Sequence, residues 1–332
     1  MTAIQDAASE ADTTSDFELL ALPLLKVAQC AAIACAGWSG RGDAKKADGA
    51  AVAAMREALS GVPGRGRVVI GEGEKDEAPM LYAGEEVGVG TGPAFDLAID
   101  PLEGTSYCAS GLDGAITVLA AAPRDHLWAT PGYYMEKMVV GKRARGAIDL
   151  REPVGVNLER VAEALGKSMS DLKVVILDKP RHSELIDEVR RAGAAVMEIP
   201  AGDVMGSLRA LVPAGGVDVC LGVGGAPEGV ITACAVRLLG GDMQVRLAPQ
   251  SDKERQMVLD QGGDLDQVLT AEELVTSSEG VFVATGVTNG FLLSAPERSD
   301  TGWCTRSLLV TPGTGVLVVD ALDMPGPGID LR

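Results

Sequence analysis

Histidine and cysteine are scarce in this sequence, and their scarcity restricts the metal sites that it can form. The 332 residues include two histidines, His126 and His182, and six cysteines, none of which forms a CxxC pair. Zinc sites and dithiol redox centres are therefore not expected, and the cysteines, which lie in apolar segments, are typical of buried free thiols in a reducing cytoplasm. Any metal ion bound by this chain must be held by carboxylates.

Aromatic residues and positive charges are also in short supply. Aromatic residues make up 3% of the chain, and 29 Lys and Arg stand against 47 Asp and Glu, so the formal net charge is -18. This composition argues against a base-stacking surface and against nonspecific binding to nucleic acid or to an anionic membrane. An anionic substrate would need local cations, supplied by a metal or by a few well-placed Lys and Arg side chains.

Targeting signals are a further absence. No continuous apolar run reaches transmembrane length, and the opening residues MTAIQDAASEADTTSDFE are acidic and polar, unlike a secretory signal or a basic transit peptide. We therefore expect a cytoplasmic protein with no membrane partner. Residues 1–20 are predicted to form a flexible N-terminal tail, and residues 323–332, which contain the run MPGPGID, a loose C-terminal tail.

The chain does contain short β-rich runs that alternate with helical patterns. Helices are predicted over residues 23–38 and 47–60, strands over 68–70, 94–100 and 115–122, and a regular strand-helix alternation over 174–239. This pattern predicts an α/β fold whose sheets are covered by helices on both faces. The hydrophobic share of 46% is enough for a full core without disulfides. We place one domain at residues 21–172 and a second at residues 173–322.

Three acidic clusters lie where predicted strands end. They are GEGEKDEAP at residues 71–79, DPLEGT at residues 100–105 and GGAPEG at residues 224–229. Each alone could be a solvated turn, since Asp, Glu, Gly and Pro are ordinary turn residues. Ligands bind at the carboxyl ends of strands in open α/β sheets, however, and many carboxylates gathered there repel one another unless cations neutralise them. The three clusters together therefore indicate a site for Mg²⁺ or Mn²⁺, which prefer oxygen ligands.

The DPLEGT cluster has the spacing that such a site needs. Asp100 and Glu103 are three residues apart in a turn, where Pro101 fixes the backbone and Gly104 permits a sharp bend. Thr105 then places a hydroxyl beside both carboxylates. A hydroxyl in this position can orient a water molecule, which suits hydrolysis.

The GGAPEG cluster also has a competing interpretation as a dinucleotide-binding turn. A GxGxxG fingerprint would begin at Gly222 and Gly224, but its last position is Pro227. Pro227 fits the first turn of a helix, where Glu228 suits the positive helix end. Because that carboxylate would repel a pyrophosphate and attract a metal, we reject the dinucleotide interpretation.

Seven motifs of this sequence resemble, in their order, those of the class II fructose-1,6-bisphosphatases. The resemblance runs from about Leu25 to about Val318, weakens after residue 245, and is carried by GRGDAKKADGAAVAAMR, VVIGEGEKDEAPMLYAGEEVG, DLAIDPLEGT, YYMEKMVVG, DKPRH, GVGGAPEGV and VFVATGVTNG. DPLEGT is also similar to the metal motif of the wider lithium-sensitive phosphatase superfamily. The resemblance implies a layered α-β-α-β-α fold, a metal-binding catalytic domain followed by a sugar-phosphate-binding domain, and homo-oligomers such as dimers or tetramers.

The same resemblance implies roles for individual residues. Mg²⁺ or Mn²⁺ would be held by Asp48, Glu72, Asp100, Glu103 and Glu228 and by the backbone carbonyl of Leu102. The catalytic residues would be Thr105, Asp48 and Glu72, with Thr105 helping to activate the attacking water. Binding of the sugar phosphate would involve Glu103, Gly104, Thr105, Tyr134, Lys179, Arg181, Asp203 and Gly225, of which Tyr134, Lys179 and Arg181 would hold the phosphate that is not cleaved.

Several of these residues also have structural interpretations. Asp48 could cap the helix that follows it, and both roles can coexist. Lys179 and Arg181 could be surface charges at a strand end, and Tyr134 could fill a core. We expect His182 to be an exposed or capping residue rather than a catalyst.

Two positions depart from the family pattern. Ala44 follows GRGD where the family usually has Lys, and Ala201 stands in the IPxGD segment where a sugar-contacting Asp is expected. Three hypotheses follow. The chain hydrolyses the 1-phosphate of fructose 1,6-bisphosphate, and possibly acts on sedoheptulose 1,7-bisphosphate; it is a specialised paralogue that acts on another phosphorylated sugar, cyclitol or sugar-containing metabolite; or it is a noncatalytic sugar-phosphate-binding regulator.

Overall fold

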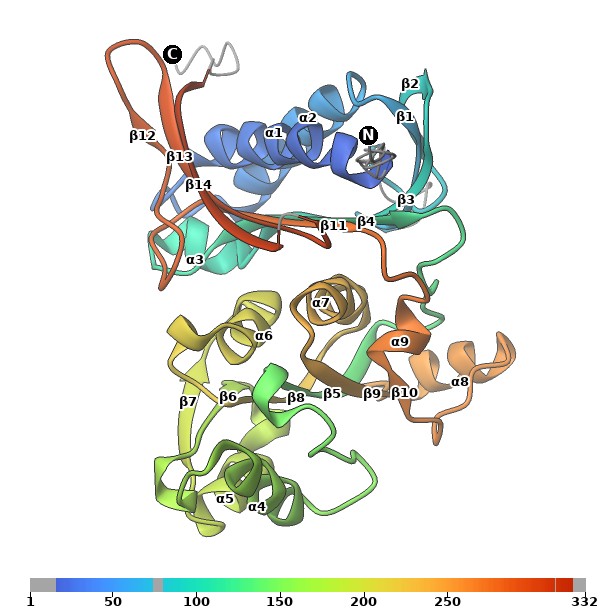
Figure 1. The fold of residues 1–332 in the computed structure, drawn as a ribbon, viewed down its shortest axis with the longest axis vertical. Helices are drawn as coiled ribbons and strands as arrows, with labels where there is room; N and C mark the ends of the chain where they lie inside the picture. Colours follow the sequence, from blue (N-terminus) through green and yellow to red (C-terminus); the bar gives the residue numbers. More distant parts are fainter. Residues whose placement is uncertain (1–15, 74–79, 314, 325–332) are drawn as a thin grey trace, which may run out of the picture.

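The chain folds into two stacked β-sheets with layers of helices above, between and below them (Figure 1). This computed structural model describes residues 16–73, 80–313 and 315–324. Helices α1 (Asp16–Ala36) and α2 (Ala44–Leu59) cover the outer face of the first sheet. Helices α6 (Asp203–Leu211) and α7 (Ala226–Leu239) lie between the sheets, and α4 (Val154–Leu165) and α5 (Ser183–Arg191) cover the second. The predicted α/β class and the α-β-α-β-α layering are confirmed.

The first sheet contains strands from both ends of the chain. Its order is β12-β13-β11-β4-β3-β1-β2, with β14 paired to β13. β1 and β3 are parallel, and the other pairs are antiparallel. The strands are β1 (Gly64–Ile70), β2 (Glu86–Thr91), β3 (Ala94–Glu103), β4 (Ile116–Pro123), β11 (Val281–Gly286), β12 (Glu297–Arg298), β13 (Trp303–Thr311) and β14 (Gly315–Met324).

The second sheet is built from the middle of the chain in the order β10-β9-β5-β8-β6-β7. β6 is parallel to β7 and β8, whereas β5 is antiparallel to β8 and β9. The strands are β5 (Tyr134–Val140), β6 (Lys173–Leu177), β7 (Ala195–Ile199), β8 (Val219–Gly225), β9 (Asp242–Leu247) and β10 (Leu269–Thr270). The shorter helices α3 (Thr105–Ser110), α8 (Asp252–Asp260) and α9 (Ala271–Leu274) complete the described fold, together with the 3₁₀ turns η1 (Lys142–Ala144), η2 (Met169–Asp171), η3 (Pro180–His182) and η4 (Pro213–Gly215).

The sheets do not divide the chain at residue 172. β5 precedes this position but belongs to the second sheet, and β11 to β14 return to the first sheet. The domain ranges 21–172 and 173–322 remain a prediction about folding units, but they do not describe sheet membership. The N-terminal prediction is corrected in one respect, because residues 16–20 already form the first turn of α1. Residues 1–15 and 325–332 lie outside the described residues.

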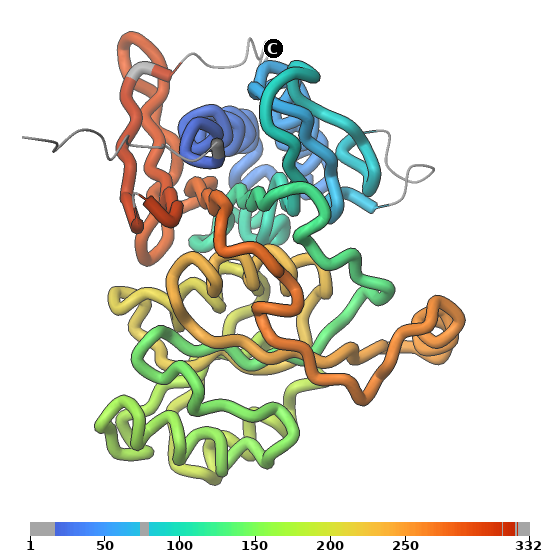
Figure 2. Tube along the Cα trace, turned by 45° about the vertical axis from the view of Figure 1, so that its right-hand side comes forward, coloured from blue at the N-terminus to red at the C-terminus, as the bar shows by residue number. Residues whose placement is uncertain are grey.

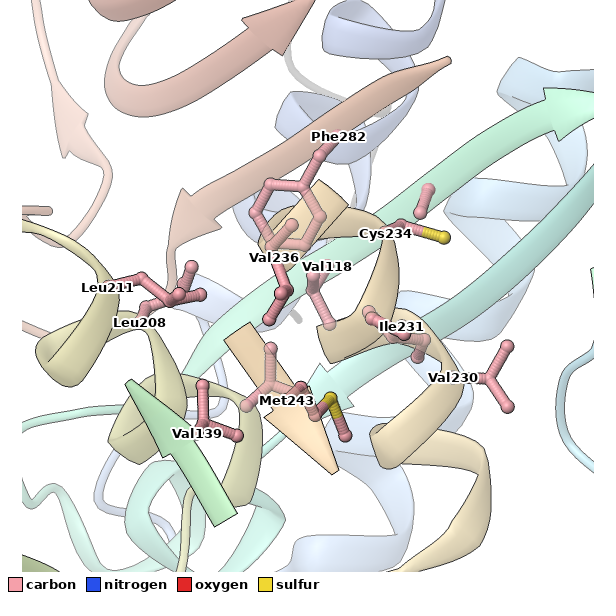
Figure 3. Close-up of a cluster of buried hydrophobic side chains, with 14 of the residues drawn as sticks. Val118, Val139, Leu208, Leu211, Val230, Ile231, Cys234, Val236, Met243 and Phe282 are labelled. Carbon is pink, nitrogen blue, oxygen red and sulfur yellow. The ribbon is translucent and has the colours of Figure 1, made fainter. Parts of the chain in front are cut away.

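One hydrophobic core joins the two sheets. Phe282 and Val118 point into it from the first sheet, Val139 and Met243 from the second, and Ile231 from α7 between them (Figure 3). All five side chains are at most 1% exposed. Because interiors packed to this density resist sliding, the two sheets are held as one body, and side chains from both can form one site.

Helix α1 is apolar enough to test the expectation of no transmembrane-length run. Phe17–Ala36 is 20 residues long with a mean hydropathy of 1.9, so by length and composition this helix could cross a membrane, and the expectation was wrong. Two thirds of that window, 67%, is buried inside the protein. α1 packs on α2, β4, β11 and β13, and Figure 2 shows it between the C-terminal strands and β1–β2. These contacts make it a core helix of the first sheet.

Candidate active site

The first part of the site is an irregular end of β3. The pairing of β3 with β4 shifts between Asp100 and Glu103, because Pro101 has no N–H to donate to the ladder. The carbonyl of Pro101 accepts a hydrogen bond from Thr117 Oγ1 at 2.9 Å, and Asp100 Oδ1 accepts one from the Leu102 amide at 3.0 Å. These bonds fix the irregular turn and bring both carboxylates to the same end of the strand.

The same turn leads directly into α3. Gly104 has a φ of +79°, in the left-handed region where an added Cβ would lie 3.1 Å from the ring of Tyr107. Thr105 begins α3, and its hydroxyl donates to the Leu102 carbonyl at 3.0 Å. Since the proton is used in this bond, the lone pairs of Thr105 Oγ1 remain to accept a hydrogen bond from a water molecule.

The second part of the site is the junction between β8 and α7. The positions of Gly224 and Gly225 have no room for a side chain, because an added Cβ would overlap the carboxylate of Asp203 at the first and of Glu228 at the second. Pro227 and Glu228 lie in the first turn of α7, as expected. The glycines therefore make space for two acidic side chains.

Three of the predicted metal ligands meet at this point. Carboxylate oxygens of Asp100, Glu103 and Glu228 all lie within 4.8 Å of one another. Burial raises the pKa of each, and further carboxylates add to this: Glu103 for Asp100, Glu228 for Glu103, and Asp203 for Glu228. Three carboxylates so close together, of which Glu103 is buried and the other two are half-buried, are stable as anions only beside a cation.

Asp48 and Glu72 extend the acidic group. Burial, and then the charge of Asp48, raises the pKa of Glu72 to about 7. Burial also raises the pKa of Asp48, and Glu72 is among the charges that raise the pKa of Asp100. The two are thus electrostatic neighbours of the trio but not members of its 4.8 Å group. The capping interpretation of Asp48 was wrong, because Asp43 caps α2 by accepting from the Lys46 amide, and Asp48 lies inside the helix.

The donor set fits a hard divalent cation. It consists of carboxylate oxygens, with the Leu102 carbonyl nearby through its bond to Thr105, and no cysteine or histidine belongs to this trio. Mg²⁺ and related ions take oxygen ligands of this kind. The raised pKa values of the three carboxylates fit this interpretation, because a bound cation would supply the positive charge that favours their ionised forms.

Basic and aromatic side chains line the same cavity as Glu103 and Glu228. The cavity has a volume of about 490 Å³ and runs from Glu103 and Thr105 to Tyr134, Lys179 and Arg181. Arg181 donates from Nε and Nη2 to the Val223 carbonyl at 3.2 and 2.8 Å, and its guanidinium lies 5.4 Å from the centre of the Tyr134 ring. An anion held by Lys179 and Arg181 would lie in the same cavity as Glu103 and Glu228.

The buried side chain of His182 connects the backbone at the end of β6 with that of β8, next to Arg181. It is 1% exposed, its Nδ1 lies 2.7 Å from the Leu177 carbonyl, and its Nε2 accepts from the Val223 amide at 2.8 Å. These partners require a neutral ring with the proton on Nδ1. Burial lowers the pKa of His182, which agrees with the neutral form. The prediction of an exposed histidine was wrong, because the side chain turns into the protein and ties η3 to β8. His182 does occupy the N-cap position of α5, as the capping alternative predicted, but its side chain makes no capping hydrogen bond there.

Asp203 connects the two parts of the site. It lies at the start of α6 after Gly202, and the next amide, that of Val204, donates to Glu103 Oε1 at 2.7 Å. A carboxylate from the first sheet thereby caps a helix of the middle layer. Asp203 is also ion-paired with Lys137, a buried residue of β5.

Lys137 was missed at the level of the sequence, where YYMEKMVVG was used only as part of the resemblance. The alternation of Met135, Lys137 and Val139 on one face of a strand was the available signal. The positions of the two departures are also defined. Ala44 is the first residue of α2, whereas Ala201 lines the cavity and donates its amide to the Tyr107 hydroxyl at 3.2 Å.

The chain is similar to known proteins over most of its length. Residues 18–320 match the family model described as bacterial fructose-1,6-bisphosphatase, glpX-encoded. The chain is 46% identical over 304 residues to fructose-1,6-bisphosphatase 2 class 2 of Escherichia coli K12, an alignment that covers 88% of this chain and 95% of the relative. It is 45% identical over the same length to fructose-1,6-bisphosphatase class 2 of Haemophilus influenzae, with coverages of 88% and 91%.

Proposed function

The chain belongs to the class 2 fructose-1,6-bisphosphatase family, a family of metal-dependent phosphoric monoester hydrolases, and we propose that it hydrolyses the 1-phosphate of fructose 1,6-bisphosphate. The observation that supports this most directly is the meeting of Asp100, Glu103 and Glu228. The cavity lined by Glu103 and Glu228 is also lined by Thr105 and by the basic side chains of Lys179 and Arg181. The acidic end suits the phosphate that is cleaved, and the basic end suits the phosphate that is retained.

The cation belongs at the acidic end. Asp100, Glu103 and Glu228 would hold Mg²⁺ or Mn²⁺, with Asp48, Glu72 and the Leu102 carbonyl as further ligands. When bound, such an ion neutralises charge on the phosphoryl oxygens and lowers the pKa of water. Either ion accepts this all-oxygen donor set, so the preferred one is found by measuring activity with each after the protein has been stripped of metal.

The protein residues orient the reacting groups. Thr105 Oγ1, whose proton is engaged with Leu102, accepts a hydrogen bond from the attacking water and so directs a lone pair of that water at phosphorus. Asp48 and Glu72 are the nearby carboxylates, one of which takes up the released proton. Lys179 and Arg181 hold the retained phosphate against Tyr134, while Glu103, Gly104, Asp203 and Gly225 line the sugar.

Phosphate release from fructose 1,6-bisphosphate tests the activity. With Mg²⁺ or Mn²⁺ the wild-type protein should release one phosphate per sugar, and a folded sample inactive with both ions would contradict the proposal. Thr105→Ala should lower kcat by about 10²-fold or more, because the attacking water loses the group that orients it. Thr105→Ser keeps the hydroxyl and should retain most of the activity. Ser106→Ala, a change at the adjacent cavity residue, is the matched control.

A second candidate substrate is favoured by Ala201. This residue lines the cavity but has no side-chain acceptor for a sugar hydroxyl, so discrimination between sugars is expected to be altered. Sedoheptulose 1,7-bisphosphate and other phosphorylated sugars or cyclitols should be compared by kcat/KM. The third hypothesis is a noncatalytic regulator. It is supported only if neither the wild type nor Thr105→Ala releases phosphate from any of these phosphorylated sugars or cyclitols.

The described surface also supports self-association. Strand β14 ends the first sheet and exposes Val316, Leu317, Val318 and Leu322, which are between 42% and 71% exposed. We infer a homo-oligomer, a dimer or a tetramer, in the cytoplasm, where the six free thiols would remain reduced. Light scattering measures the mass directly, and a monomer at micromolar concentration would overturn this inference.

A further inference from the structure

Lys137 is an unusual residue for its surroundings. It is 1% exposed, and within the described parts of the chain no other lysine or arginine is buried to this degree. A charged ammonium is costly to bury without a partner. Its partner is Asp203, whose Oδ2 pairs with Lys137 Nζ and which is itself 8% exposed.

The position of Lys137 separates it from the cavity. It lies on β5 in the centre of the second sheet, between Gly222 of β8 and Val245 of β9. Its neighbours on the same face, Met135 and Val139, belong to the core between the sheets. Asp203 lines the cavity, whereas Lys137 does not. Lys137 therefore cannot touch a ligand in the cavity except through Asp203.

The surroundings of Asp203 explain why an anchor is needed. Its carboxylate occupies the space beside Gly224, and the carboxylates of Glu103 and Glu228 are close enough to act on its charge. Without an opposite charge, repulsion from these neighbours would turn Asp203 away from the trio. The pair with Lys137 fixes one oxygen, Oδ2, and leaves Oδ1 to accept hydrogen bonds.

We propose that Lys137 is a positioning residue that holds Asp203 in place as a hydrogen-bond acceptor for the sugar hydroxyls of the substrate. This role rests on the proposed function, since it assigns the sugar to the same cavity. With Ala201 beside it lacking an acceptor, Asp203 carries more of the sugar recognition. The ammonium thereby determines sugar affinity from a place that no substrate atom reaches.

The kinetic consequence is a split between KM and kcat. Lys137→Met should raise the KM for fructose 1,6-bisphosphate by about ten- to a hundredfold, the range of a lost hydrogen bond to a charged group. The kcat should change less than KM, because Lys137 pairs directly with Asp203 and acts on Glu103 and Glu228 only through its charge. Lys137→Arg keeps the positive charge and should restore part of the affinity. Lys173→Met, the same change at an exposed lysine of β6 in the same sheet, is the control.

A double-mutant cycle with Asp203→Asn separates positioning from a general effect on folding. Lys137→Met alone leaves a buried anion unpaired and can destabilise the protein, whereas Lys137→Met with Asp203→Asn leaves no unpaired charge. If Lys137 acts through Asp203, adding Lys137→Met to Asp203→Asn changes KM by less than about threefold. Equal effects in both backgrounds, or a loss of kcat with an unchanged KM, would overturn the inference.

Product binding keeps this test independent of hydrolysis. Calorimetry with fructose 6-phosphate and Mg²⁺ measures the sugar site directly, and the same cycle of variants should show the same coupling in Kd. A wild type that binds this product without releasing phosphate from the bisphosphate refutes the proposed function and leaves the role of Lys137 standing. A wild type that does not bind the product overturns the role of Lys137.

Discussion

At the scale of single residues, Val223 shows how the basic wall is held. Its carbonyl accepts both hydrogen bonds of Arg181, and its amide donates to the ring of His182. Two adjacent side chains of η3 thus form hydrogen bonds with the backbone N–H and the backbone carbonyl of one residue of β8. Arg181 keeps its remaining donors for an anion because its aim is set by the backbone of a neighbouring strand.

His182→Ala should therefore weaken both the fold and the anion wall. The change removes two buried hydrogen bonds and leaves a cavity, which should cost about 2–4 kcal/mol of unfolding free energy. Urea unfolding in saturating Mg²⁺ measures this. His126→Ala is the matched control, because His126 is less buried and should cost less than about 1 kcal/mol. Equal losses for the two variants would contradict the support role of His182.

At the scale of elements, the turn between β8 and α7 is shaped by the side chains that it admits. Gly222 would place a Cβ 3.0 Å from the His182 ring, and the next two glycines lie against Asp203 and Glu228. Gly222, Gly224 and Gly225 are thus explained by three side chains of the site and not by a bound dinucleotide.

Gly225→Ala should damage the site more than the fold. The added methyl meets the flexible end of Glu228, so the carboxylate can turn away while the backbone stays in place. Mn²⁺ affinity, measured by calorimetry, should fall by about ten- to a hundredfold, as for other groups that orient a metal ligand. Gly155→Ala in α4 meets open space and should leave the affinity unchanged. An unaltered affinity in Gly225→Ala would show that Glu228 is not a ligand.

At the scale of the whole molecule, the ionised carboxylates of the acidic site lower the free energy of unfolding of the metal-free protein. Glu72 binds its proton more tightly in the folded chain, with a pKa of about 7, than in the unfolded one, and the trio is shifted in the same direction. A raised carboxylate pKa stabilises the fold fully at low pH, and this stabilisation is lost as pH rises through the folded value.

The metal-free protein should therefore lose stability between pH 6.5 and pH 8.5. Unfolding by urea in EDTA should show a decreasing free energy over this window. His182, whose pKa is lowered in the fold, acts in the opposite direction only at the lower end, where the unfolded histidine still binds a proton. With saturating Mg²⁺ the decrease should disappear, because the ion pairs with the ionised carboxylates. Parallel pH profiles in EDTA and in Mg²⁺ would count against a metal site at these residues.

Local geometry decided how much of this site could be predicted from the sequence. Asp100, Glu103 and Thr105 lie within one turn, and the β-α alternation placed Glu228 at a helix start, so both clusters were accessible. Lys137 was not, because its partner Asp203 is 66 positions away and β5 was not recognised as a strand. The return of β11 to β14 to the first sheet was equally hidden, since sequence periodicity reports strands but not their neighbours.

The burial of α1 has a consequence for the synthesis of the protein. α1 packs against α2, which follows it directly in the chain, and against β4, β11 and β13, of which the last two are translated near the end of the chain. On the ribosome, the apolar face of α1 that packs on β11 and β13 stays exposed until almost the entire polypeptide has been made. This takes on the order of ten seconds or more at cellular elongation rates. During that time α1 is a natural substrate for chaperones that recognise nascent apolar segments.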